Sequence, residues 1–90
     1  MAHAVVLKVE LPGEGRDEEG RQLLVDVVVP NAKAQAGFQS GIWMNKGGEG
    51  MAVVVFDSEA NARSAQDQLK PPPGGPKLVS SEVFEVGAEA

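Results

Sequence analysis

The chain has 90 residues, a formal net charge of -5, three Phe, one Trp and neither Cys nor Tyr. This length predicts one domain, residues 1–90, with a thin hydrophobic core. The missing cysteines exclude disulfides, thiolate catalysis and cysteine-based metal sites. The acidic balance disfavours nucleic acid and anionic membranes as partners, because both are negatively charged. No signal-peptide pattern or membrane-length apolar run is present, so we expect a cytoplasmic protein.

The first predicted element is a strand over residues 4–11, AVVLKVEL. Successive side chains of a strand point to opposite faces. One face receives Val5, Leu7, Val9 and Leu11, and the other receives Val6, Lys8 and Glu10. The residues PGEGRDEEG that follow contain the turn formers that end such a strand.

A helix is predicted next, over Asp17–Ala36, with Asp17 as its cap. Its segment LLVDVVVP, residues 23–30, is rich in β-branched residues and also suits a strand. Length and the 3.6-residue spacing of the apolar side chains favour the helix. Pro30 is expected to kink it, because the proline ring clashes with the carbonyl of Asp26.

The second half of the chain predicts a hairpin, a helix and a last strand. The hairpin joins strands Phe38–Asn45 and Met51–Asp57 through a turn that contains Gly47 and Gly48. A helix capped by Asp57 or Ser58 is expected to reach Lys70 before a proline-rich bend, and residues 77–86 form the last strand. The inner side of this helix is predicted to carry Ala62, Ala65 and Leu69. The order βαββαβ indicates a ferredoxin-like α+β fold: a four-stranded antiparallel sheet with two helices on one face.

The strand over residues 51–57 is apolar on both sides, so we expect the sheet face away from the helices to be covered as well. The number of residues in the glycine turn decides which side chains of the preceding strand share that face. A turn of two or four residues assigns to the open face Phe38, Ile42, Met44, Met51, Val53 and Val55. It assigns to the helix side Gln39, Gly41, Trp43 and Asn45, which suits a small cavity for water or a ligand. An odd turn exchanges the two faces.

The octet EGMAVVVF, residues 49–56, has the outline of an RNA-recognition strand. It lacks the parts that bind RNA, since Glu49 stands at the basic position and Met51 and Val53 stand where bases need aromatic rings. Phosphate-loop and Ser-His-Asp patterns are also absent from the sequence. His3 is the single histidine, and no second His or Cys could complete a metal site with it. We therefore expect no metal and no nucleic acid.

Two segments, VVPNAKAQAGFQSGIWM and GMAVVVFDSEANARSA, resemble the dimeric α+β barrel proteins, and within them the antibiotic-biosynthesis-monooxygenase-like group. The spacing of Pro30, Gly37-Phe38, Gly41 and Trp43 carries much of this likeness, which covers nearly the whole chain. The resemblance implies a homodimer whose sheets pack face to face, with ligands held between sheet and helices. Some members oxygenate polycyclic aromatic compounds without metal or flavin, so no cofactor is expected. Haem-degrading members need a helical His, which this chain lacks.

The sequence leaves two functions open. One is a cofactor-independent monooxygenase-like protein that acts on a small aromatic ligand, and the other is a non-catalytic homodimeric module for ligand binding or scaffolding. The residues predicted to line the ligand cleft are Gln39, Trp43, Asn45, Leu24 and Val28. A lone Trp in a thin core also suits plain packing, and Asn45 beside the glycine turn suits a turn residue.

Overall fold

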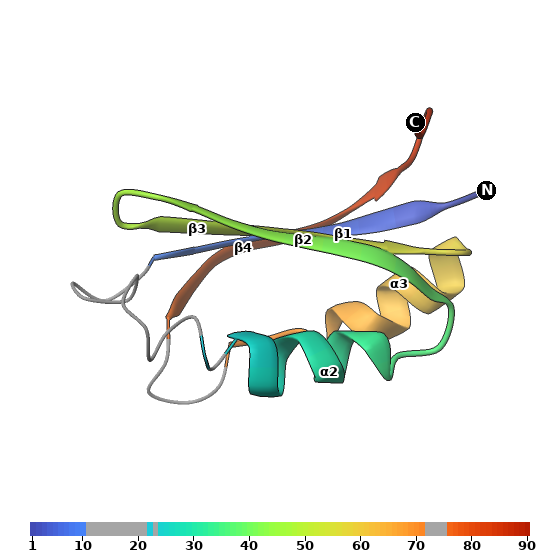
Figure 1. Cartoon of the computed structure of the whole chain (residues 1–90). Coiled ribbons are helices and arrows are strands. Elements are labelled where there is room, and N and C mark those ends of the chain that lie inside the picture. The colour runs from blue at the N-terminus through green and yellow to red at the C-terminus, as the bar shows by residue number, and fades with distance from the viewer. Residues whose placement is uncertain (11–21, 23, 72–75) are drawn as a thin grey trace.

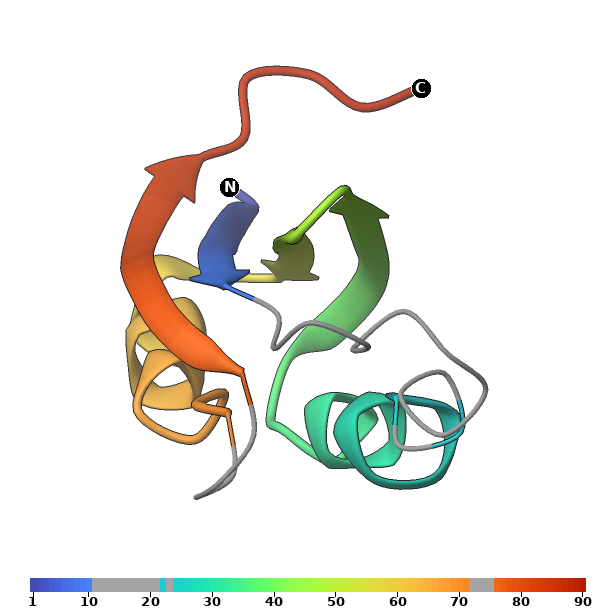
Figure 2. The same ribbon diagram turned by 90° about the vertical axis from the view of Figure 1, so that its left-hand side faces the viewer.

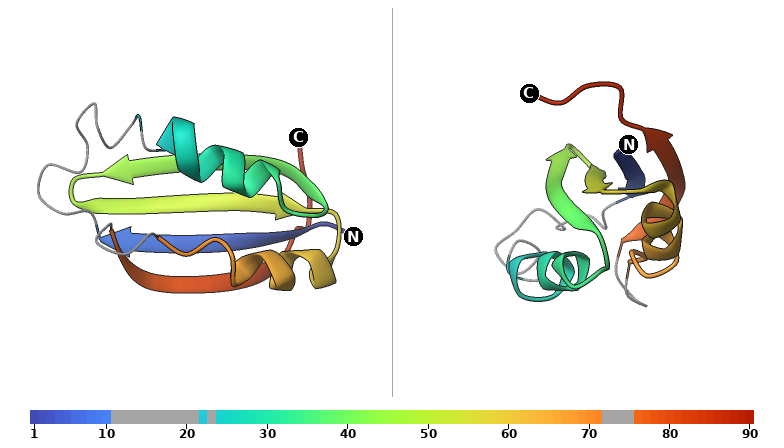
Figure 3. Two further views of the ribbon diagram at one scale, coloured as in Figure 1. Left: turned by 90° about the horizontal axis from the view of Figure 1, so that it is seen from below. Right: turned by 90° about the vertical axis from the view of Figure 1, so that its right-hand side faces the viewer.

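Four antiparallel strands form one sheet in the order β2-β3-β1-β4, and the helices lie together on one of its faces (Figure 1). The computed structural model describes residues 1–10, 22, 24–71 and 76–90. Its elements are β1 (His3–Glu10), η1 (Leu24–Val28), α2 (Val29–Lys33), β2 (Phe38–Lys46), β3 (Glu49–Phe56), α3 (Glu59–Gln66) and β4 (Lys77–Glu85). Helix α2 packs on β2, while α3 packs on β1, β3 and β4 (Figure 3). The predicted ferredoxin-like α+β fold is confirmed.

The hairpin turn contains two residues, Gly47 and Gly48, as the even-turn prediction requires. Gly47 has a φ of 60°, in the left-handed region that glycine adopts without steric cost. Beyond the turn, Lys46 pairs with Glu49 and Trp43 with Ala52. Trp43 therefore shares a face with Ala52, and each strand extends one or two residues closer to the turn than predicted.

The first predicted helix is helical over Leu24–Lys33 but is not one regular α-helix. Residues 24–28 form a π-helical turn, and α2 begins at Val29 with Pro30 in its first positions. Because proline has no N–H to donate, a regular α-helical ladder cannot run through it to the carbonyl of Asp26. The hydrogen-bonding pattern of the helix therefore changes just before Pro30, the residue at which the sequence predicts a kink. The helix ends at Lys33, three residues before Ala36, and its predicted start at Asp17 lies outside the described residues.

The second helix begins as predicted and ends early. Ser58 caps it, since its Oγ accepts a hydrogen bond from the Asn61 backbone N–H at 3.2 Å. Regular α-helix stops at Gln66 rather than at Lys70. The Leu69 N–H still donates to the Ala65 carbonyl at 3.0 Å, so the next turn keeps Leu69 buried on the predicted inner side.

Replacing Ser58 by Ala is expected to lower the free energy of unfolding by about 1 kcal/mol, because the Asn61 N–H loses its acceptor. Chemical denaturation followed by circular dichroism measures the change. Ser64→Ala is the matched control, since Ser64 is exposed within α3 and caps nothing. A loss no larger in Ser58→Ala than in Ser64→Ala would contradict the role of the cap.

The core lies between the sheet and the helices. β3 shows the division most clearly, because Gly50, Ala52, Val54 and Phe56 are buried while the residues between them are half-buried. The buried apolar cluster consists of Val5, Leu7, Ala32, Ala52, Val54, Phe56, Ala62, Ala65 and Leu69. Within the described part of the chain, no helix has the length and apolar content needed to cross a membrane.

Candidate functional site

The start of β2 departs from the predicted alternation. Its pairing with β3 is irregular between Phe38, which aligns with Phe56, and Ser40, which aligns with Val55. Phe38 packs against the core, and its ring meets that of Phe56 edge to face with centroids 6.3 Å apart. The prediction that Phe38 lies on the open face is therefore wrong, because a bulge inserts one extra residue, the exposed Gln39.

Trp43 lies on the helix side of β2, half-buried against the core. Its ring lies across Gly41, where an added Cβ would be 2.7 Å from Cη2 and 2.8 Å from Cζ3. The same Cβ would be 3.6 Å from the Phe38 ring. The space beside Gly41, which the sequence suggested as part of a ligand cavity, is thus occupied by the indole ring. Glycine is required here because any side chain would displace Trp43.

Gly41→Ala is accordingly expected to move the indole ring and to lower the free energy of unfolding by about 1–3 kcal/mol through overpacking. Because Trp43 is the single Trp, a red shift of its fluorescence on exposure to water reports the displacement directly. In the double variant Gly41→Ala with Trp43→Val, circular dichroism should show that most of the Gly41→Ala penalty disappears. Equal penalties with and without the indole would show that Gly41 and Trp43 are not coupled.

The five predicted cleft residues are only partly brought together. Trp43 and Asn45 lie on the same side of β2, but Asn45 is exposed at the hairpin end. Leu24 and Val28 are half-buried in the π-helical turn, one turn apart. Gln39 is exposed at the bulge, away from the hairpin end. The helix side of β2 thus carries the half-buried indole ring of Trp43 and, near the hairpin turn, the exposed amide of Asn45.

Side-chain amides link the helices to other parts of the chain, contacts that the sequence pattern does not predict. Asn31 of α2 donates from Nδ2 to the Gln68 carbonyl at 3.2 Å, and Gln35 donates from Nε2 to the Asn31 carbonyl at 3.1 Å. Gln66 of α3 donates to the Ser81 carbonyl on β4 at 3.0 Å. The Asn31–Gln68 and Gln66–Ser81 bonds join residues 37 and 15 positions apart, pairings that no local pattern indicates.

The opposite face of the sheet carries an apolar cluster that is solvent-exposed in the single chain, with charged residues at its hairpin end. All described helices lie on the other side, as the view along the strands shows (Figure 2). Ile42 is 59% exposed and Met44 46% exposed, although both are large and apolar. Half-buried apolar residues surround them, so the open face carries Val6, Ile42, Met44, Met51, Val53, Val55 and Phe84. Five of the six residues predicted for this face are among them, and Phe38 is the exception.

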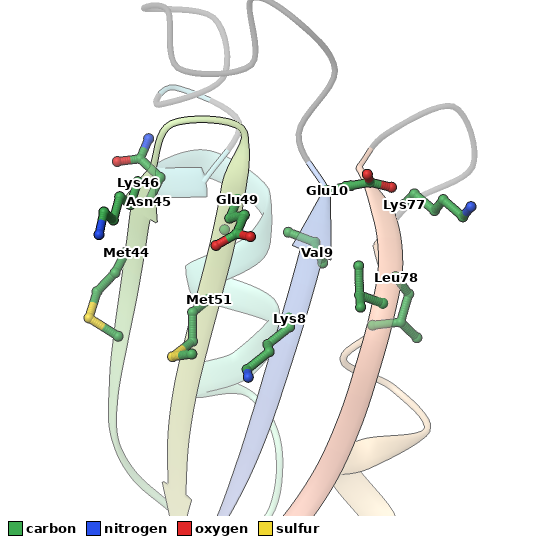
Figure 4. A pocket seen from close by; sticks show the side chains of 12 residues that line it. Lys8, Val9, Glu10, Met44, Asn45, Lys46, Glu49, Met51, Lys77 and Leu78 are labelled. Carbon is green, nitrogen blue, oxygen red and sulfur yellow. The ribbon is translucent and has the colours of Figure 1, made fainter.

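A shallow hollow of about 830 Å³ lies at the hairpin end of the sheet (Figure 4). Apolar side chains, Met44, Met51 and Leu78 among them, line it together with charged ones. Lys8 and Glu49 extend into this region from the central strands (Figure 4). The alternation of residues 4–11 had already separated Lys8 and Glu10 from the core side chains, so this polar end was recognisable in part.

Electrostatics do not single out a catalytic group in the part of the chain that the structure describes. Arg63 donates from Nη2 to Glu59 Oε2 at 2.8 Å, and this hydrogen bond and the Arg63 charge lower the pKa of Glu59. The pair is an exposed i, i+4 contact on α3 and marks no cleft. Among the described residues, no group of three or more His, Asp or Glu side chains could hold a metal ion.

Comparison with solved structures supports the fold. MupZ of Pseudomonas fluorescens superposes with a TM-score of 0.63 at 13% identity, over 91% of this chain and 69% of its own. A Chloroflexus aurantiacus protein whose proposed activity is antibiotic biosynthesis monooxygenase gives 0.62 at 13% identity, over 100% and 98%. Rv0793 of Mycobacterium tuberculosis gives 0.61 at 19% identity, over 100% and 99%. No protein-family model matches the sequence, and no curated protein matches it either. The chain thus shares the ferredoxin-like α+β fold of these three proteins, the fold that the resemblance of its sequence implied.

Proposed function

We propose that this protein is a homodimeric small-molecule-binding module that assembles through the open face of its sheet. The exposed apolar cluster on this face supports the homodimer in this proposal, because monomers rarely leave more than a few hundred Å² of contiguous apolar surface in water. A second copy of the chain would cover this face with an equally apolar surface, since an isologous contact pairs the same patch on both subunits.

The size of the face supports a stable contact. Four strands of eight or nine residues span about 500 Å² in flat projection, at roughly 4.8 Å between strands and 3.3 Å per residue. Protruding Ile, Met, Val and Phe side chains add accessible surface to this projection. One face thereby approaches the roughly 800 Å² per partner that is typical of a specific interface.

Sedimentation equilibrium over a range of micromolar concentrations tests the assembly. The expected result is a species of about twice the chain mass. A monomer at all concentrations would remove the basis of the proposal, whatever ligand the protein binds.

A cofactor-independent oxygenase is the second candidate. The fold that this chain shares with the Chloroflexus aurantiacus protein favours it, together with the indole of Trp43 and the amide of Asn45 on the helix side of β2. An indole can stack on a planar aromatic substrate, and an amide can hydrogen-bond to its oxygen atoms. The filled space at Gly41 favours packing for part of the indole surface, which is why binding without catalysis is the leading proposal.

Oxygen consumption with polycyclic aromatic quinols separates the two candidates. A binding module should quench Trp43 fluorescence on titration with such a compound and consume no oxygen above the background rate. An oxygenase should consume oxygen, and Asn45→Ala should reduce that rate without changing the dimer. Neither quenching nor oxygen uptake across a set of such compounds would leave a scaffold as the function.

A further inference from the structure

The distribution of charged and apolar residues on the open face is asymmetric both along the strands and across them. Its four cross-strand rows follow from the strand registers. From the hairpin end they read Lys46-Glu49-Glu10-Lys77, then Met44-Met51-Lys8-Ser80, then Ile42-Val53-Val6-Glu82, then Ser40-Val55-Ala4-Phe84. Charge is thus concentrated at the hairpin end. Apolar side chains are concentrated on β2 and β3, whereas β1 and β4 carry most of the polar ones.

Two stacked copies related by a two-fold axis can align their strands in two ways, since aligned sheets keep their strand directions within about 30°. An axis parallel to the strands superposes the two hairpin ends and lays β2 over β4 of the partner. An axis across the strands places the hairpin ends at opposite ends of the dimer and lays β2 over β2. The rows decide between these arrangements.

Superposed hairpin ends bring like charges together. The end row has the order plus, minus, minus, plus, which is unchanged when the strand order is reversed. Lys46 would lie over Lys77 of the partner subunit, and Glu49 over Glu10 of the partner subunit. In the next two rows, Met51 would lie over a lysine and Ile42 over a glutamate. Like-charge contacts and apolar groups set against charges both weaken an interface.

Opposed hairpin ends match the surfaces better, because no like charges then face each other. Met44 lies over Ile42 of the partner subunit, and Met51 over Val53 of the partner subunit, so the apolar residues of β2 and β3 cover each other. Of the two central rows, only Lys8, over Val6 of the partner subunit, sets a charge against an apolar group. Each charged row lies at the outer edge, next to the small and apolar fourth row, where water still reaches the lysine and glutamate groups. Lys77 comes near Phe84 of the partner subunit, a ring that is 50% exposed in the single chain and that attracts an ammonium group.

We infer that the two subunits stack with their hairpin ends apart, so that the charged rows of Lys46, Glu49, Glu10 and Lys77 form the two ends of the dimer. This inference rests on the proposed function, because it needs the dimer through the open face. It adds a constraint that the dimer alone does not contain: the apolar strands β2 and β3 of one subunit cover the same strands of the other.

A spin label on Gly48→Cys measures the arrangement. The chain has no native cysteine, and a Cβ at Gly48 would meet no atom within 4 Å, so the variant carries one label on an undisturbed turn. With sheets about 10 Å apart and 3.3 Å per residue, opposed hairpins place the two turns about 30 Å apart, and superposed hairpins place them about 15 Å apart. Pulsed electron paramagnetic resonance distinguishes these distances.

The expected result is a distance near the longer value, which disappears when labelled chain is diluted into excess unlabelled chain. A short distance in a sedimenting dimer would overturn the inference and leave the dimer itself intact. Labelled chain that sediments as a monomer and shows no dipolar coupling would overturn both.

Discussion

Val53→Glu is expected to convert the proposed dimer into monomers over the micromolar range. Val53 lies in the third row of the open face, on a central strand, paired with Ile42 on one side and Val6 on the other. An isologous contact places the substitution in the interface twice. Each carboxylate would be buried without a partner, at a cost of about 3–5 kcal/mol, so dimerisation should weaken by at least about 100-fold.

Sedimentation velocity over a concentration series measures this loss, and circular dichroism shows whether the fold survives. Val25→Glu is the matched control, because Val25 is 59% exposed on η1, in the helical layer away from the open face. Ile42→Glu is the second test, since its 59% exposure lets the single chain tolerate the charge. If both open-face variants stay dimeric while folded, the assembly does not use this face.

The core and the order of the elements could be predicted because local rules decide them. The period-2 alternation of β1 and β3 fixes which side chains face the helices, and the two glycines fix the parity of the hairpin. Once that parity is known, Trp43 and Ile42 fall on opposite faces without further information. The length of the turn therefore decides which side chains of β2 face the helices and which face the open side.

Other features depend on contacts that the sequence does not display. The bulge at Gln39 moves Phe38 to the helix side, where its ring contacts Phe56 from the neighbouring strand. Alternation cannot detect such an insertion, because an apolar ring suits either face. The sequence places Gly41 beside a small cavity, but the indole ring of Trp43 lies across it. The choice between cavity and packing depends on a rotamer, which sequence spacing does not determine.

The charged row shows a third kind of limit. Lys8 and Glu10 were assigned correctly to the side away from the core, yet their neighbours Lys46, Glu49 and Lys77 come from three strands. Only the registers of all the strands bring Glu10 into one row with these three residues. Surfaces built from several strands thus follow from topology and register together, while the faces of single strands follow from local alternation.

Gly37→Ala is expected to be the most damaging single-methyl change, lowering the free energy of unfolding by about 2–4 kcal/mol. Gly37 has a φ of 79°, a left-handed conformation that costs alanine about 1–2 kcal/mol. Its carbonyl accepts from the Asp57 N–H at 2.9 Å, which joins the start of β2 to the end of β3. An added Cβ would overlap Asp57 Oδ1 and lie 2.5 Å from Asn61 Nδ2.

The loss of stability should extend beyond the local clash, because Asp57 Oδ1 and Asn61 Nδ2 are hydrogen-bonded to each other. Asn61 donates from Nδ2 to Asp57 Oδ1 at 2.7 Å, so moving either group to admit a methyl breaks this bond at the start of α3. Gly48→Ala makes the same change where nothing lies within 4 Å and φ is not positive, and it should alter stability by less than about 0.5 kcal/mol. Urea denaturation of the two variants measures the difference, and Gly37→Ser should be no less damaging than Gly37→Ala. Equal stabilities for Gly37→Ala and Gly48→Ala would mean that neither the left-handed backbone nor the crowding at the strand-to-helix joint constrains the fold.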